Sequence, residues 1–394
     1  MIAVLKGWRL QLLVIALTLA PCVGMENARA TALDERVAAL RGTIVKNAAG
    51  QIVDVNLEGA ATTADDVKLI AAEPELAKVR VSGAAVDDAA LALLARLPKL
   101  VDLALLDSAV SNAGLAVLVD APKLRMLSLQ GSAAVGNDGM DSIAKLKELT
   151  HLSIAYTRVN DAGIAKLADF KKLRLLDVRG CLITDASLHV AGQLPMLASL
   201  KCRSSAITDA GLEQLAGAKQ LRGLHLEDAR LSDEGMQKLA NLKALDDLNL
   251  LRAPIGDAGL TPLAGMTKMR QLQLRATFVA DDGLANLAKM NELFKLDLSE
   301  TEVAGPGLEH LVGLPKLQWL NLWNTFVDDA GMDHVAKMTA LQDLILDGTM
   351  VTDAGIAKLS TLTKLKTLSV SQTSVTAEGM AALQKALPNV KIRR

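Results

Sequence analysis

VTDAGIAKLSTLTKLKTLSV, residues 351–370, is one of more than a dozen near-copies of the same segment in this chain of 394 residues. Aligned on the residue that opens each strand, the copies recur every 24 residues, with one residue inserted near Ala133. A period of this length predicts a solenoid, because each repeat buries its apolar side only by stacking on its neighbours. The opening residues are Ile52, Leu76, Leu100, Leu124, Leu149, Leu173, Leu197, Leu221, Leu245, Met269, Leu293, Leu317, Leu341 and Leu365.

Each repeat, or rung, contains two hydrophobic periods. Leu317, Leu320 and Leu322 follow the pattern LxxLxL, whose end alternates and predicts a short strand. The spacing of Met332, Val335 and Met338 predicts a helix of two or three turns. A helix is wider than the roughly 4.8 Å between strands. We therefore expect an α/β solenoid, an arc or horseshoe, with a parallel sheet on the concave face and helices on the convex face.

An aspartate recurs where each strand segment gives way to the helix. A carboxylate at this position could accept hydrogen bonds from the free amides of the first helical turn. A glycine two residues later suggests close approach of neighbouring helices. A carboxylate needed in nearly every rung indicates scaffolding rather than catalysis. The aspartates are Asp161, Asp185, Asp209, Asp233, Asp257, Asp281, Asp329 and Asp353.

This spacing resembles the leucine-rich repeat family, LxxLxLxxN/CxL, over residues 52–392. The [TS]DAGLxxLAxL helix is most similar to the subgroup of F-box-associated and ribonuclease-inhibitor-like repeats. The resemblance implies a curved solenoid that binds something, usually a protein, and it transfers no catalytic residue. One difference is that threonine often replaces the family's Asn or Cys, as in Thr277, Thr301, Thr325, Thr349 and Thr373. Their hydroxyls could bond loop backbone, as a looser ladder.

The two ends of the chain differ from the repeats. Residues 1–30 have a basic start, an apolar run and Ala28-Arg29-Ala30, the plan of a cleavable secretory signal peptide. An uncleaved membrane anchor is the alternative, and a lipoprotein at Cys22 is a weaker one. Residues 31–51 predict a helix and a strand that form an N-terminal cap, followed by a solenoid of about fourteen rungs over residues 52–394. We expect an exported protein, periplasmic or extracellular, with no membrane span in the mature chain.

Composition narrows the class of function. A net charge of −1, from 43 basic and 44 acidic side chains, argues against a nucleic-acid binder. Cys181 and Cys202 fall at different points of adjacent rungs and predict two separate buried thiols. The sequence contains none of the common catalytic or phosphate-binding motifs. His310 and His334 occupy equivalent helix positions, where solvated side chains are expected rather than a metal site. We predict no enzyme activity, no catalytic residue, no metal and no cofactor.

The variable positions beside the strand leucines should face the concave surface. Trp319, Asn321 and Trp323 fall there together, and exposed tryptophans are enriched at binding sites. They could instead pack under a loop or against each other. We predict a binding site for a protein or peptide here, and a carbohydrate or cell-wall ligand stacked on the tryptophans is the alternative. Neighbouring rungs would contribute Lys295, Asp297, Asp343, Ile345 and Asp347.

A second group of charged residues lies earlier in the chain. Arg179, Lys201, Arg203 and His225 fall at concave positions of adjacent rungs, with Glu227 beside them. The group could bind an anion or an acidic partner. A solvated charged face is an equal alternative. Phe278 and Phe326 occupy equivalent loop positions after their strands, where we expect loop packing.

Overall fold

The computed structural model describes residues 32–394. The predicted signal peptide and Cys22 therefore lie outside the described residues. Contacts divide the chain into a first unit that ends at Arg158 and a second unit from Val159 to Arg394. Both units are built from the same strand-and-helix rung.

The first unit begins with a helical segment over residues 32–39, which leads into β1. β1 pairs antiparallel with β2, and β2 to β6 then pair in parallel, each with the next strand in sequence. The strands are β1 Thr43–Lys46, β2 Ile52–Ala61, β3 Lys78–Ser82, β4 Asp102–Leu106, β5 Met126–Ser128 and β6 His151–Ser153. The further helices, with η denoting a 3-10 helix, are α2 Ala64–Ala71, α3 Asp88–Leu94, η1 Gly114–Asp120 and α4 Gly139–Ile143.

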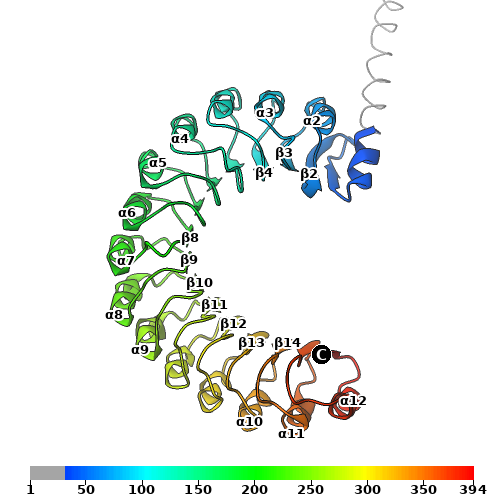
Figure 1. The fold of residues 1–394 in the computed structure, drawn as a ribbon, viewed down its shortest axis with the longest axis vertical. Helices are drawn as coiled ribbons and strands as arrows, with labels where there is room; N and C mark the ends of the chain where they lie inside the picture. Colours follow the sequence, from blue (N-terminus) through cyan, green and yellow to red (C-terminus); the bar gives the residue numbers. More distant parts are fainter. Residues whose placement is uncertain (1–31) are drawn as a thin grey trace, which may run out of the picture. The chain divides into compact units, whose positions relative to one another are not determined.

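The second unit continues the pattern with parallel strands paired in sequence order. Within it, Figure 1 shows the strands on the inner side of a curve and the helices on the outer side. The strands are β7 Leu175–Asp177, β8 Ser199–Arg203, β9 Gly223–Glu227, β10 Asp247–Asn249, β11 Gln271–Gln273, β12 Lys295–Asp297, β13 Trp319–Asn321, β14 Asp343–Ile345, β15 Thr367–Ser369 and β16 Lys391–Arg393.

The helices of the second unit differ in length and type. Some reach the two or three turns that the sequence pattern predicts, whereas others have a single α-helical turn or are partly or wholly 3-10 helix. The helices of this unit are α5 Asp161–Ala165, α6 Asp185–Gln193, α7 Asp209–Leu215, α8 Asp233–Met236, η2 Gln237–Asn241, α9 Asp257–Leu260, η3 Thr261–Gly265, η4 Asp282–Leu287, η5 Pro306–Leu311, α10 Met332–Val335, α11 Asp353–Ala357, η6 Lys358–Thr361 and α12 Ala377–Ala386.

The core follows the predicted leucine columns. Leu317, Leu320 and Leu322 are fully buried, as are Met332 and Val335 on the helix side of the same rung. Paired strands keep a register of one repeat, so residues at equivalent positions lie beside each other. Trp319, for example, pairs with Lys295 on one side and Asp343 on the other.

The repeated aspartates join successive rungs, and their predicted role as caps of their own helices is wrong. In the α7 rung, Thr208 is the N-cap and its side chain accepts a hydrogen bond from the Ala210 amide. Asp209 instead accepts hydrogen bonds from the next rung, from the Ser232 amide at 2.9 Å and the Ser232 hydroxyl at 2.6 Å. Four other aspartates, namely Asp161, Asp185, Asp329 and Asp353, hold the following threonine in the same way.

The glycine in the same motif makes room for this carboxylate. A Cβ atom at Gly235 would lie 1.9 Å from Oδ1 of Asp209. A Cβ atom at Gly211 would lie 2.4 Å from Oδ1 of Asp185. The close approach predicted at the glycine is therefore made to an aspartate side chain of the preceding rung, and the two motif positions depend on each other.

The threonine ladder bonds the loop backbone of its own rung. The hydroxyl of Thr325 donates to the Leu322 carbonyl at 2.7 Å, and that of Thr349 donates to the Leu346 carbonyl at 2.6 Å. Each bond closes the turn that follows the strand.

Cys181 and Cys202 are both buried, as predicted, and no disulfide joins them. No helix within residues 32–394 is long and apolar enough to cross a bilayer.

Candidate binding surface of the second unit

The two tryptophans lie on the inner side of the second unit, at and just after β13. Pleating directs Leu320 and Leu322 into the core. Trp319 and Trp323 point the other way and are half-buried, so they are less exposed than the sequence pattern suggested. Asn321 between them accepts a hydrogen bond from the Trp323 amide at 3.0 Å, which fixes the turn.

Cations cover one face of each indole ring. Nζ of Lys295 lies 4.7 Å from the ring centroid of Trp319. Cζ of Arg275 lies 4.8 Å from the ring centroid of Trp323. Neither contact matches the predicted alternatives, in which the rings pack under a loop or against each other. A cation over an aromatic face is attracted by the ring quadrupole and restricts the ring's rotamers.

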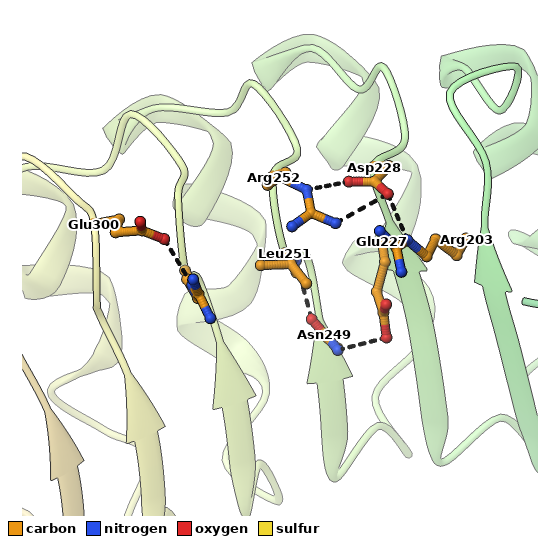
Figure 2. A network of polar contacts seen from close by, with 8 residues as sticks. Arg203, Glu227, Asp228, Asn249, Leu251, Arg252 and Glu300 are labelled. Carbon is orange, nitrogen blue, oxygen red and sulfur yellow. Dashed lines mark hydrogen bonds and ion pairs between the residues drawn. The ribbon is translucent and has the colours of Figure 1, made fainter. Parts of the chain in front are cut away.

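Arg275 is a residue that the sequence reasoning missed. It occupies the same repeat position as Trp323, two rungs earlier, and it donates to Oε2 of Glu300 at 2.6 Å. A dashed line in Figure 2 marks this contact at Glu300. The shared position was a usable signal, because equivalent positions of a solenoid line up in one column.

Acidic side chains flank the tryptophans and are held by hydroxyl groups. Asp343, beside Trp319 in the sheet, accepts a hydrogen bond from Thr367. Asp347 accepts one from the hydroxyl of Ser369 at 2.8 Å. Asp297 accepts one from Ser299 at 2.6 Å. Ile345 pairs with Asn321 in the register and provides an apolar position among these carboxylates. The surface thus presents fixed aromatic, cationic and anionic groups within three strands.

The earlier charged group is largely neutralised within the protein. Arg179 donates to both carboxylate oxygens of Asp177, at 3.0 and 2.7 Å. Arg203 donates to Asp228 at 2.7 Å, and Arg252 binds the same carboxylate from the other side (Figure 2). These pairs balance the guanidinium charges, and an anion would have to compete with carboxylates already in place. Lys201 lies beside His225 in the paired strands β8 and β9.

Charge pairing also sets the acidity of Asp228. The hydrogen bonds from Arg252 and Arg203 hold the pKa of this carboxyl below its usual range, while burial acts in the opposite direction. The residue adopts a left-handed conformation with φ of 61° at the turn after β9. An aspartate tolerates this conformation better than most side chains.

A polar pair of a buried histidine and a half-buried aspartate adjoins the charged group. His225 is 8% exposed, and its Nε2 lies 3.0 Å from Oδ2 of Asp247 on β10. Its Nδ1 atom and Oδ1 of Asp247 have no hydrogen-bond partner among the described residues. Asn249 donates to Glu227 at 3.1 Å beside them (Figure 2). The sequence reasoning named His225 and Glu227 but missed Asp247 and Asn249, which stand one rung further on.

Phe278 and Phe326 do not pack into their loops as predicted. Their exposed fractions are 60% and 57%, and they line an open recess of about 650 Å³ beside the C-terminal ends of β11, β12 and β13. The loops are closed by threonine hydroxyl bonds to backbone, so the rings are not needed as filling. The recess is lined by Ala276, Thr277, Phe278, Glu300, Thr301, Glu302, Asn324 and Phe326.

Comparison with solved structures identifies the architecture. An internalin of Listeria monocytogenes (inlF) superposes with a TM-score of 0.52 at 18% identity, over 92% of this chain and 93% of that one. A leucine-rich-repeat protein of Leptospira interrogans gives a TM-score of 0.52 at 17% identity, over 89% and 99%. The fold is a leucine-rich-repeat solenoid. No protein-family model and no curated protein matches the sequence.

The leucine-rich-repeat resemblance is therefore confirmed for the fold. Identities of 17% and 18% show the fold alone. In such a solenoid the strand positions that face away from the core are free to vary, and they determine what the surface can bind. The groups around β12, β13 and β14 occupy these positions in the second unit.

Proposed function

We propose that this solenoid is an exported, non-enzymatic scaffold that recognises a protein or peptide on the concave face of its second unit. The observation that supports this most strongly is the tryptophan pair. Trp319 and Trp323 stand on one rung, each backed by a cation from a preceding rung. Rings held in this way lose little conformational entropy on binding, a property of aromatic anchors at protein interfaces.

The surroundings favour a protein partner over a saccharide. A sugar ring stacks on a flat aromatic face, and one face of each indole is already covered by a cation. Asp343, Asp347 and Lys295 offer charges of both signs, which suit the mixed side chains of a peptide. A partner that contacts these charges should bind more weakly as salt screens them.

Export is proposed from residues 1–30, whose basic start, apolar run and Ala-Arg-Ala ending fit a cleavable leader. The compartment would be periplasmic or extracellular. The two buried thiols are compatible with either compartment, because they are buried, and burial raises the pKa of Cys202 and keeps it from forming a reactive thiolate. We also propose the F-box-associated and ribonuclease-inhibitor-like repeat type, on the recurrent TDAG segment.

The test is affinity capture from an envelope extract. Wild-type protein is compared with a Trp319→Ala/Trp323→Ala variant and with Met126→Ala, which changes the position in β5 of the first unit that is equivalent to Trp319. Loss of an aromatic anchor costs about 2 kcal/mol or more, so the double variant should bind its ligand roughly thirtyfold more weakly or worse. Met126→Ala should retain it.

Treating the extract separates the two ligand classes. Protease digestion should abolish capture if the ligand is a protein, whereas periodate oxidation should abolish it if the ligand is a saccharide. Retention of the same ligand by the double variant would refute the assignment of the site to β13.

In a full-length Trp8→Phe chain the remaining indoles are Trp319 and Trp323. A change in tryptophan fluorescence on adding the captured ligand would therefore report on this rung directly.

A further inference from the structure

The recess beside the C-terminal ends of β11, β12 and β13 has a composition that differs from the concave face. Phe278, Glu302 and Phe326 occupy the same position in three successive rungs. All three are exposed, and the side chain of Glu302 makes no hydrogen bond or ion pair with any residue of the described chain. A carboxylate therefore stands between two exposed aromatic rings.

The backbone that carries these side chains is fixed. The amides of Phe278, Glu302 and Phe326 each donate to a carbonyl of the preceding rung, at 2.9, 2.9 and 3.0 Å. The threonine before each of them closes its own turn through a hydroxyl bond. Neighbouring strands are about 4.8 Å apart, so the two phenylalanines are anchored roughly 10 Å from each other with Glu302 midway. The separation leaves room for a flat group between the rings.

The charge of the recess is not balanced from within. Glu300, also in the lining, is paired with Arg275. Ala276 lines the recess at the repeat position where the previous rung has Arg252, whose guanidinium binds Asp228. With alanine there, no arginine of this column reaches Glu302. A wholly apolar occupant would leave the Glu302 carboxylate without a partner, at a cost in free energy.

We propose that this recess binds an arginine side chain of a protein partner. A guanidinium is planar and stacks on aromatic faces, whose negative quadrupole attracts it. Its paired N–H groups match the two oxygens of a carboxylate such as that of Glu302. The inference does not depend on the tryptophan site, because the recess is formed by other residues, in the turns after the strands.

The chain offers a direct probe, because its four phenylalanines are Phe170, Phe278, Phe294 and Phe326. Full-length protein labelled with 4-fluorophenylalanine is titrated with N-acetyl-arginine amide and followed by fluorine NMR. The signals of Phe278 and Phe326 should move and saturate. Phe170 is fully buried, and Phe294 already lies under Arg270 at 5.6 Å, so their signals should stay in place. N-acetyl-citrulline amide, which is neutral and of the same shape, should cause no saturable change.

Two variants complete the test. Glu302→Gln and Phe326→Leu should each weaken binding of the arginine probe by about two- to fivefold, the usual range for an exposed ion pair or cation–aromatic contact. Glu309→Gln, which removes the same charge from η5, should leave the affinity unchanged. Equal binding of citrulline, an unaffected Glu302→Gln variant, or no saturable shift at Phe278 and Phe326 would overturn the proposal. Lysine amide binding as tightly as arginine amide would refute the guanidinium assignment.

Discussion

Replacing Asp209 with alanine tests whether the aspartate column joins the rungs of the solenoid. The Asp209 carboxylate accepts two hydrogen bonds from Ser232 of the next rung, from its amide and its hydroxyl. Asp257 occupies the same position two rungs later and accepts a single bond from residues 32–394, from the Ala280 amide at 2.7 Å. The pair of variants Asp209→Ala and Asp257→Ala therefore differs by one hydroxyl bond.

The expected cost follows from these contacts. A hydrogen bond to a charged group contributes about 1.5–3 kcal/mol, so two bonds give roughly 3–6 kcal/mol at most. Asp209 and Ser232 are only partly buried, so in the variant water can hydrogen-bond to Ser232 and recover part of this free energy. We expect a loss of about 2–4 kcal/mol in the free energy of unfolding for Asp209→Ala. Asp257→Ala should lose about 1–2 kcal/mol, since it breaks one bond.

The assay is urea unfolding followed by circular dichroism, together with hydrogen exchange at the Ser232 amide. The m-value, the slope of the free energy of unfolding against urea concentration, should be the same in all variants, so that a shift in the urea midpoint reports a change in stability alone. Asp169→Ala, an exposed aspartate outside the column, is the control for removing a charge. Equal losses for Asp209→Ala and Asp257→Ala, or a loss at Asp209 no larger than at Asp169, would refute the reasoning.

Three further predictions concern single residues. Asp228→Asn keeps the left-handed backbone but removes the charge. Because the pKa of Asp228 is lowered in the folded state, wild type should be more stable than this variant at pH 6, and the difference should fade as the pH falls below about 4. Urea midpoints measured across that pH range check this. Ala276 has φ of 55°, so Ala276→Gly should raise the free energy of unfolding by about 0.5–1 kcal/mol, and a lower melting temperature would contradict this. Cys202 is fully buried with a raised pKa, so native protein should leave it unmodified by iodoacetamide at pH 8 while denaturant exposes it, as mass spectrometry of the Cys202 peptide would show.

The fold could be predicted from the sequence because the information is local and repeated. The pattern of each rung predicts which faces of its strand and helix are buried, as the alternation at Leu320 and Leu322 and the helical spacing at Met332 and Val335 show. Fourteen copies of the pattern remove the ambiguity that a single copy would leave. The type of helix was less predictable. A pattern of buried positions does not distinguish an α turn from a 3-10 turn, since both place residues three apart on one side.

The partner of the repeated aspartate could not be found by the same reasoning. Asp209 follows Thr208 at a helix start, and local rules place such a carboxylate on the amides of its own helix. In the structure the threonine takes that role, and Asp209 is left to bond Ser232 across the rung boundary. The signal was present in the spacing, because Gly235 follows Ser232 by three residues and leaves the space that the carboxylate fills.

The candidate sites depend on side-chain reach, which a periodic pattern does not contain. Strand pairing predicts that Trp319 lies beside Lys295, and the cation over its ring is a contact between adjacent rungs. Arg275 contacts the ring of Trp323 two rungs away, across roughly 10 Å of sheet, and only a long side chain at the turn after the strand makes this contact. The reach of Arg275 also bears on the recess. Arg275 contacts Glu300 and Trp323, so its guanidinium neutralises the Glu300 carboxylate, and Glu302 keeps its negative charge between two aromatic rings.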